Sequence, residues 1–219
     1  VLGAVVLARA GSEEALASLA ERGFFPKEDL ETLRHIGSHL QGHPNMNDTP
    51  GVDMSTGSLG QGISAAVGMA VAAKHWGDTY RTYALLGDGE SEEGQVWEAA
   101  MSAAHHRLSR LIAIVDRNGF QLDGRVDDVV GIEPLADKWR AFGWDVHEVD
   151  GHDVDALYTL LHRLKDEDDR TGPACVIAHT IKGKGVSFME TEPGWHLGYL
   201  DPIDAAAAAD EIRAGARRP

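Results

Sequence analysis

The amino-acid sequence predicts an α/β fold in which a parallel sheet is covered by helices on both faces. Short apolar segments typical of strands alternate along the chain with longer segments of helical periodicity. Two of the strand-like segments end in loops rich in glycine and polar residues. Alternating strands and helices are typical of parallel sheets, whose strands are joined by crossover helices. Ligands of such folds bind where the carboxyl ends of the strands meet.

The first part of the chain predicts two helices and a long loop. Ser12 precedes an Ala-, Leu- and Glu-rich segment that ends at Gly23, which is typical of a capped helix. A second predicted helix runs from Pro26 to Ile36, because proline is favoured in the first helical turn. Residues 41–57 carry Gly, Pro, Asn and Asp without a periodic apolar face, and they predict a loop long enough to be functional.

The rest of the chain predicts the strands and their connecting helices. Residues 59–76 form a predicted helix rich in small residues, which indicates close packing against another backbone. The predicted strands span residues 83–86, 111–115, 145–149 and 174–178. The remaining predicted helices span residues 92–108, 135–142, 154–164 and 205–217. No segment has the composition of a linker, so we expect residues 1–219 to form a single domain.

Composition excludes several classes of protein. The chain has 219 residues, and 20 Lys and Arg against 35 Asp and Glu give a net charge of −15, which disfavours binding to nucleic acid or anionic membranes. The apolar run at residues 1–8 is too short to span a bilayer and lacks the basic flank of a signal peptide. Cys175 is the single cysteine, so a disulfide framework is excluded and a cytoplasmic location is expected.

The segment Gly87-Asp88-Gly89-Glu90-Ser91-Glu92-Glu93-Gly94 carries the strongest chemical signal. Glycines at a strand-to-helix turn allow backbone N–H groups to approach a phosphate, but the carboxylates would repel a bare phosphate. A divalent cation such as Mg²⁺ or Ca²⁺ resolves this conflict by bridging carboxylate and phosphate. Asn118, at the end of the next predicted strand, is well placed as a second oxygen ligand. An ordinary acidic turn is the alternative interpretation.

The combination of the Gly-Asp-Gly turn with Asn118 resembles the thiamine diphosphate-binding motif. In proteins with this motif, an Asp, an Asn and one backbone carbonyl hold the metal on the diphosphate. By position, the resemblance implies Asp88, Asn118 and the carbonyl of Phe120 as metal ligands. It implies thiamine diphosphate and Mg²⁺ or Ca²⁺ as cofactors.

Further segments resemble transketolase, in the order of that family, from about residue 19 to residue 200. These segments are His43-Pro44, Pro50-Gly51-Val52, Thr56-Gly57-Ser58-Leu59-Gly60-Gln61-Gly62, Glu93-Gly94, Glu98-Ala99, Lys182-Gly183-Lys184-Gly185-Val186 and Trp195-His196. The likeness is strongest to the N-terminal, diphosphate-binding subunit of split two-component transketolases. It implies a thiamine diphosphate-binding fold of the diphosphate-domain type.

The resemblance assigns roles to individual residues. His43 and His196 match histidines that meet the substrate, and His196 also matches a residue beside the diphosphate. Glu93 and Glu98 match glutamates at the family's interface, although a solvated helix face is the alternative interpretation. The cofactor-binding residues implied are Gly57, Leu59, Gly60, Gly87, Asp88, Gly89, Glu93, Asn118 and His196.

The implied activity is transfer of a two-carbon ketol unit from a ketose or ketose phosphate to an aldose. The residues that activate the pyrimidine ring belong to another domain of the family, so we expect activity only with a pyrimidine-binding partner subunit, in an α₂β₂ assembly. The alternatives are an α subunit of a 2-oxoacid dehydrogenase, an acyloin-forming subunit, or a non-catalytic cofactor-binding subunit. The helix at residues 59–75 and Trp97 are candidate interface elements.

The N-terminal segment departs from the family. Transketolases usually begin with Ser-Gly-His-Pro-Gly and continue with Leu-Ser-Lys-Gly-His, and residues 1–18 contain neither segment. These segments carry two histidines of the family's substrate site. We therefore expect residues 1–18 to be atypical or truncated, with a different substrate or a loss of catalysis as alternative explanations.

Overall fold

The computed structural model describes residues 4–7, 13–166, 170–196 and 198–215. Its centre is a five-stranded sheet with the order β1-β2-β3-β7-β6, in which all neighbouring strands are parallel. The strands are β1 (Ala4–Leu7), β2 (Thr82–Gly87), β3 (Leu111–Arg117), β6 (Asp145–Asp150) and β7 (Ala174–His179). The predicted fold class is confirmed, and so are the four predicted strands. β1 was not predicted, because its apolar run lies in a segment that matched no family pattern.

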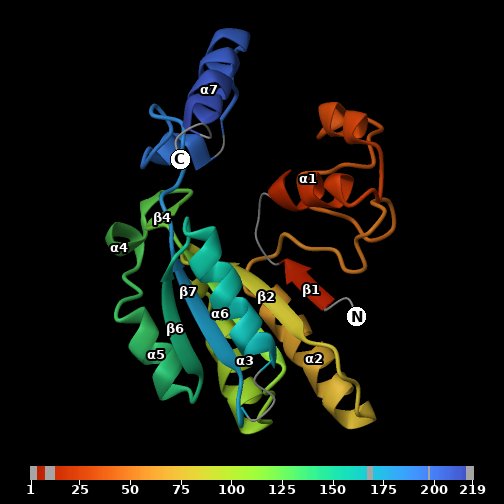
Figure 1. The fold of residues 1–219 in the computed structure, drawn as a ribbon, viewed down its shortest axis with the longest axis vertical. Coiled ribbons are helices and arrows are strands. Elements are labelled where there is room, and N and C mark those ends of the chain that lie inside the picture. The colour runs from red at the N-terminus through yellow and green to blue at the C-terminus, as the bar shows by residue number, and fades with distance from the viewer. Residues whose placement is uncertain (1–3, 8–12, 167–169, 197, 216–219) are drawn as a thin grey trace.

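The helices are α1 (Glu13–Glu21), α2 (Gln61–Trp76), α3 (Gly94–His105), α4 (Val126–Val129), α5 (Leu135–Ala141), α6 (Val154–Asp166) and α7 (Pro202–Gly215). Three 3₁₀ turns and a short hairpin complete the described elements. These are η1 (Lys27–Thr32), η2 (Gly89–Glu92), η3 (Pro193–His196), and the strands β4 (Phe120–Gln121) and β5 (Gly124–Arg125). Figure 1 shows α1 and α7 as separate projections at the side and at one end of the sheet.

Two predicted helices were wrong in part. Residues 26–36 form only the turn η1, because Leu33 leaves the helical conformation with a ψ of 127° and Arg34 has a positive φ of 63°. The predicted helix at 92–108 divides at Glu93, whose extended backbone separates η2 from α3. The C-terminal helix begins at Pro202, three residues earlier than predicted.

Helices cover both faces of the sheet, as the sequence predicts (Figure 1). Alternate residues of β3 point to opposite sides, so Ala113 and Val115 pack in the cluster formed with α2, α3 and α5, and Ile112 packs in the cluster formed with α6. Alanines of α2 and α3 line the first cluster, which allows the two helices to lie close to the sheet.

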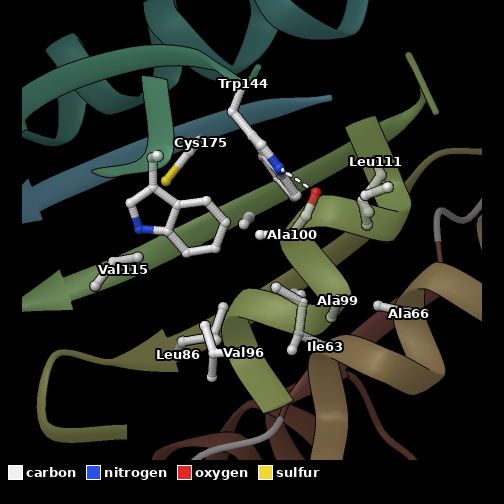
Figure 2. Packing of buried hydrophobic residues seen from close by; sticks show 14 of the residues in the cluster. Ile63, Ala66, Leu86, Val96, Ala99, Ala100, Leu111, Val115, Trp144 and Cys175 are labelled. Carbon is white, nitrogen blue, oxygen red and sulfur yellow. Dashed lines mark hydrogen bonds between the residues drawn. The ribbon is translucent and has the colours of Figure 1, made fainter. Parts of the chain in front are cut away.

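Large aromatic rings fill the space beside the alanines of α3. The Trp144 indole donates a hydrogen bond to the Ala100 carbonyl at 2.9 Å (Figure 2), and Cys175 belongs to the same buried cluster. Burial raises the pKa of the Cys175 thiol well above its ordinary value, so this cysteine is a core residue with little reactivity. Trp97, a candidate interface residue, packs against Trp139 and Phe142.

Strand register determines where the polar loops lie. Gly87 at the end of β2 is paired with Asp116 of β3, and Asp116 is paired with Ala178 of β7. The segments that follow β2, β3 and β7 therefore start from one edge of the sheet. Within the described part of the chain, no helix is long and apolar enough to cross a bilayer.

Candidate active site

Asp88 is the centre of the candidate site. It follows β2 directly, and only 1% of its surface is exposed. One carboxylate oxygen accepts the N–H of Gly89 at 2.8 Å, and the other accepts the N–H of Gly119 at 2.6 Å. The bond to Gly119 joins the turn after β2 to the turn after β3. The structure therefore brings together the two strand ends that the sequence paired.

Arg117 is a partner of Asp88 that the sequence analysis missed. Its guanidinium donates to Asp88 at 3.1 Å and to Glu133 at 2.9 Å, and it lies 3.6 Å from Asp127. Burial lowers the pKa of Arg117, but its contacts with Glu133 and Asp88 outweigh burial and raise it. The sequence does show an arginine directly before Asn118. It does not show which carboxylates this arginine pairs with, because the fold brings them together.

The Asp88 carboxylate has the properties of a cation ligand. Burial raises its pKa above the ordinary value of 3.8, although the bonds from Gly119, Gly89 and Arg117 oppose the rise. Its buried charge is thus incompletely compensated. A divalent cation prefers oxygen ligands and would supply that compensation. Three hydrogen bonds also leave acceptor capacity, because a carboxylate has about four lone-pair positions.

Asn118 is oriented by bonds within its own strand end. Its side-chain oxygen accepts the N–H of Phe120 at 2.9 Å, and its side-chain nitrogen donates to Asp116 at 3.2 Å. Asp116 also accepts a hydrogen bond from the Thr180 hydroxyl, directly after β7. These bonds fix which end of the amide is oxygen, the atom that a hard cation requires.

The predicted oxygen donors fit a cation held jointly with a diphosphate. Asp88 follows β2 directly, Asn118 follows β3 directly, and Phe120 is the first residue of β4. In the described ranges, no group of three or more His, Cys, Asp or Glu side chains could hold a metal ion. At this edge, the Asn118 amide and the Phe120 carbonyl offer oxygens in addition to the Asp88 carboxylate.

The two ends of the loop at residues 41–57 meet through His43 and Gly57. Gly57 has a φ of 116°, and a Cβ on it would overlap the His43 imidazole, so this close contact requires glycine. His43 itself is exposed. The neighbouring Thr56 hydroxyl is buried without a hydrogen-bond partner among the described residues. A buried hydroxyl without a partner among the described residues fits a place where a polar ligand binds.

The segment before α2 approaches the start of α3. Leu59 is 38% exposed, and Gly60 is buried in the left-handed conformation with a φ of 78°. A Cβ on Gly60 would lie 2.8 Å from the Cβ of Glu93, so the two helix starts meet closely. Glu93 and Glu98 are exposed. Their predicted roles, in cofactor binding and at an interface, stay predictions.

Glu90 is a second residue that the sequence analysis did not select. It is 3% exposed and accepts the backbone N–H groups of Gly60 and Gly87. The sequence shows the acidic turn, but it does not show that Glu90 bonds to Gly60, 30 residues away.

His196 is placed at the same end of the sheet. It is the last residue of η3, it is exposed, and η3 contacts β4, which contains Phe120. Its roles beside the diphosphate and toward substrate stay predictions, as does the substrate role of His43.

Comparison with known proteins now identifies the family. The sequence profile described as "Transketolase, thiamine diphosphate binding domain" matches residues 17–213. The chain belongs to the transketolase family. The transketolase profile also decides against the 2-oxoacid dehydrogenase alternative, because it covers nearly all of the chain.

Two relatives of this transketolase chain are subunits by name. A 6-deoxy-6-sulfo-D-fructose transketolase subunit from a Clostridium species is 45% identical over 209 residues, which cover 94% of this chain and 74% of that protein. One of the named subunits of apulose-4-phosphate transketolase from Actinobacillus succinogenes is 46% identical over 195 residues, which cover 89% of this chain and 70% of that protein. These matches confirm a thiamine diphosphate-dependent transferase subunit of the two-component type, and their subunit names imply a partner.

Solved transketolases share the fold. A transketolase from Campylobacter jejuni superposes with a TM-score of 0.87 at 30% identity, covering 96% of this chain. A transketolase from Leishmania mexicana superposes with a TM-score of 0.79 at 27% identity, covering 98% of this chain. The chain spans about a third of the length of these two proteins, 34% and 37%.

Proposed function

We propose that this chain, assembled with a C-terminal pyrimidine-binding subunit, transfers a two-carbon ketol unit from a ketose or ketose phosphate to an aldose. Thiamine diphosphate supplies the electron sink for cleavage of the carbon–carbon bond when it is bound. The observation that carries the proposal is the bond from Gly119 to the buried carboxylate of Asp88 at 2.6 Å. It joins the two strand ends that a diphosphate and its cation would have to bridge.

We assign cation binding to Asp88, Asn118 and the Phe120 carbonyl, with Mg²⁺ or Ca²⁺ as the ion. Gly87 and Gly89 flank Asp88 and are assigned to the diphosphate. A Cβ on Gly87 would come no closer than 3.9 Å to a neighbouring atom, whereas a Cβ on Gly89 would lie 2.8 Å from the Gln121 Cβ, so this turn needs glycine at Gly89. Leu59 is exposed beside the His43–Gly57 contact and offers an apolar surface to the cofactor. The remaining cofactor-binding assignments are Gly57, Gly60, Glu93 and His196.

The exposed imidazoles of His43 and His196 are assigned to the substrate. A histidine can donate or accept a proton near neutral pH, which suits contact with the carbonyl and hydroxyl oxygens of a sugar. The two named relatives act on a sulfo-sugar and a sugar phosphate, both anionic. We therefore propose sugars that carry an anionic group as the first substrates to test.

The proposed assembly is α₂β₂ with a cytoplasmic location. The subunit names of the relatives support the partner, and the buried single cysteine suits a reducing compartment.

The test combines the chain, its partner subunit, thiamine diphosphate and Mg²⁺. Two-carbon transfer from hydroxypyruvate to an aldose phosphate is measured for the mixture and for each of the two chains by itself. Transfer in the mixture alone would support the proposal. Assembly and cofactor binding without transfer to any of a panel of aldoses and aldose phosphates would indicate a non-catalytic role instead.

A further inference from the structure

The carboxylate of Glu90 connects two backbone segments of the candidate site. One of its oxygens accepts the N–H of Gly60 at 2.9 Å, and the other accepts the N–H of Gly87 at 3.1 Å. Gly60 is the residue before α2, and Gly87 is the last residue of β2. One buried side chain therefore bonds to both segments at once.

Both segments carry residues assigned to the cofactor. Leu59 and Gly60 belong to the segment that precedes α2, and Gly87 and Asp88 belong to the turn that follows β2. The position of Glu90 is fixed by η2, in which the Ser91 hydroxyl donates to the Gly87 carbonyl at 3.3 Å and the Ser91 N–H donates to the Asp88 carbonyl at 2.9 Å. The donors and the acceptor are thus held before any ligand arrives.

We propose that Glu90 is a positioning residue that keeps the segment at residues 57–60 aligned with the Asp88 turn, so that thiamine diphosphate meets a preformed site. This inference rests on the proposed function. An ionised carboxylate only accepts hydrogen bonds, and its bonds to N–H groups are stronger than those of a neutral acceptor, more so away from water. Holding binding groups in place before the ligand arrives reduces the free-energy cost of binding.

The variant Glu90→Gln tests the proposal with little change in size. It replaces one carboxylate oxygen with an NH₂ group, which would face an N–H and cannot accept from it. We expect the apparent affinity of the assembled enzyme for thiamine diphosphate, at saturating Mg²⁺, to fall roughly tenfold. The value of kcat at saturating cofactor should stay within about threefold of wild type, because Glu90 does not touch the substrate.

Glu31→Gln is the matched control. Glu31 is exposed on η1, so this variant removes the same charge without removing a buried acceptor, and it should bind the cofactor as wild type does. Wild-type affinity in Glu90→Gln would overturn the proposal. A fall in kcat that saturating cofactor does not restore would also overturn it and would indicate a purely structural role.

Amide hydrogen exchange in the wild-type complex gives a test that does not depend on a variant. The Gly60 and Gly87 amides should exchange slowly before cofactor is added, because both are already bonded to Glu90. Fast exchange of both amides would overturn the proposal. A wild-type complex that binds thiamine diphosphate without ketol transfer would overturn the proposed function alone, since weakened binding in Glu90→Gln would still support the alignment role.

Discussion

The diphosphate side and the substrate side of the candidate site are built differently. On the diphosphate side, Asp88 is 1% exposed and Glu90 is 3% exposed, and each accepts two or more hydrogen bonds. On the substrate side, His43 and His196 are exposed on a loop and a short turn. This chain thus buries and hydrogen-bonds both carboxylates by itself, whereas the two imidazoles lie exposed at its surface.

The difference has a physical reason. A buried carboxylate must be compensated by donors or cations wherever it lies, so its surroundings are fully organised. An exposed imidazole is solvated by water, so its surroundings in the protein need less organisation. We therefore expect variants on the diphosphate side to weaken cofactor binding and variants on the substrate side to weaken turnover.

The largest effect is expected from Asp88→Asn. The amide lacks the negative charge and would place an NH₂ group among the donors of Gly89, Gly119 and Arg117. Loss of a residue that binds the cation directly should weaken binding more than loss of a residue that only holds such a ligand in place. Cofactor affinity in the presence of Mg²⁺ should therefore fall by more than about 100-fold. Isothermal titration calorimetry on the assembled enzyme measures this.

Asp123→Asn is the control for that variant. Asp123 is exposed between β4 and β5, so its replacement tests the loss of a charge near the site without the loss of a buried bond. Undiminished cofactor binding in Asp88→Asn would contradict the division between the two sides.

A large but different effect is expected from Gly57→Ala. The added Cβ would displace the His43 imidazole, so kcat/KM for the donor should fall about tenfold, whereas the affinity for cofactor should fall less. Gly37→Ala is a matched control, since Gly37 also has a positive φ, 84°, and a Cβ there meets open space. Steady-state kinetics and thermal melting of both variants distinguish the effect of displacing the His43 ring from the effect of backbone strain, which both variants share.

His43→Ala sharpens the same comparison. It should lower kcat/KM for the donor and leave the dissociation constant for thiamine diphosphate within about twofold. A loss of cofactor binding as large as that in Asp88→Asn would show that the two sides are not separate.

A smaller effect is expected from Asp116→Ala. Without Asp116, the Asn118 amide loses the acceptor that helps to fix its orientation. Removing a residue that hydrogen-bonds to a metal ligand typically weakens metal affinity roughly tenfold. The measurement is a titration of Mg²⁺ at fixed thiamine diphosphate. Thr180→Val, which removes another donor to Asp116, should change Mg²⁺ affinity less, because Asn118 keeps its acceptor. An equal effect of both variants would contradict this role of Asp116.

The smallest effect is expected at Glu211 of α7, which is assigned to neither side. Bonds from the backbone and hydroxyl of Ser187 lower the pKa of Glu211 below its ordinary value of 4.5. Because the folded-state pKa is the lower one, the contact with Ser187 is fully present above pH 4.5 and is lost as the pH falls through the lowered pKa. Protection of the Ser187 amide, measured by hydrogen exchange, should therefore decrease in acid.

Glu211→Gln should show the same loss of protection at neutral pH without a change in cofactor affinity. Asp210→Asn, which removes a neighbouring carboxylate that pairs with Arg213, is the control. Protection of Ser187 that is independent of pH would show that α7 is held by other contacts.

Local patterns determined much of this protein from sequence alone. The four central strands and most of the helices follow from apolar periodicity and turn residues within windows of a few residues. Asp88 and Asn118 could be placed together because the ends of parallel strands meet at one edge. Phe120 was added only by the resemblance to the thiamine diphosphate-binding motif. The family could be recognised because its motifs keep their order along the chain.

The tertiary structure decided the rest. The pairing of β1 with β2 joins segments more than seventy residues apart, and no local pattern encodes such a partner. The same holds for the bonds of Arg117 to Asp88 and Glu133, and of Glu90 to Gly60. A charged residue in a sequence shows that a partner is needed, because burial of an unpaired charge is costly. Which partner it meets is set only when the sheet brings distant loops to a common edge.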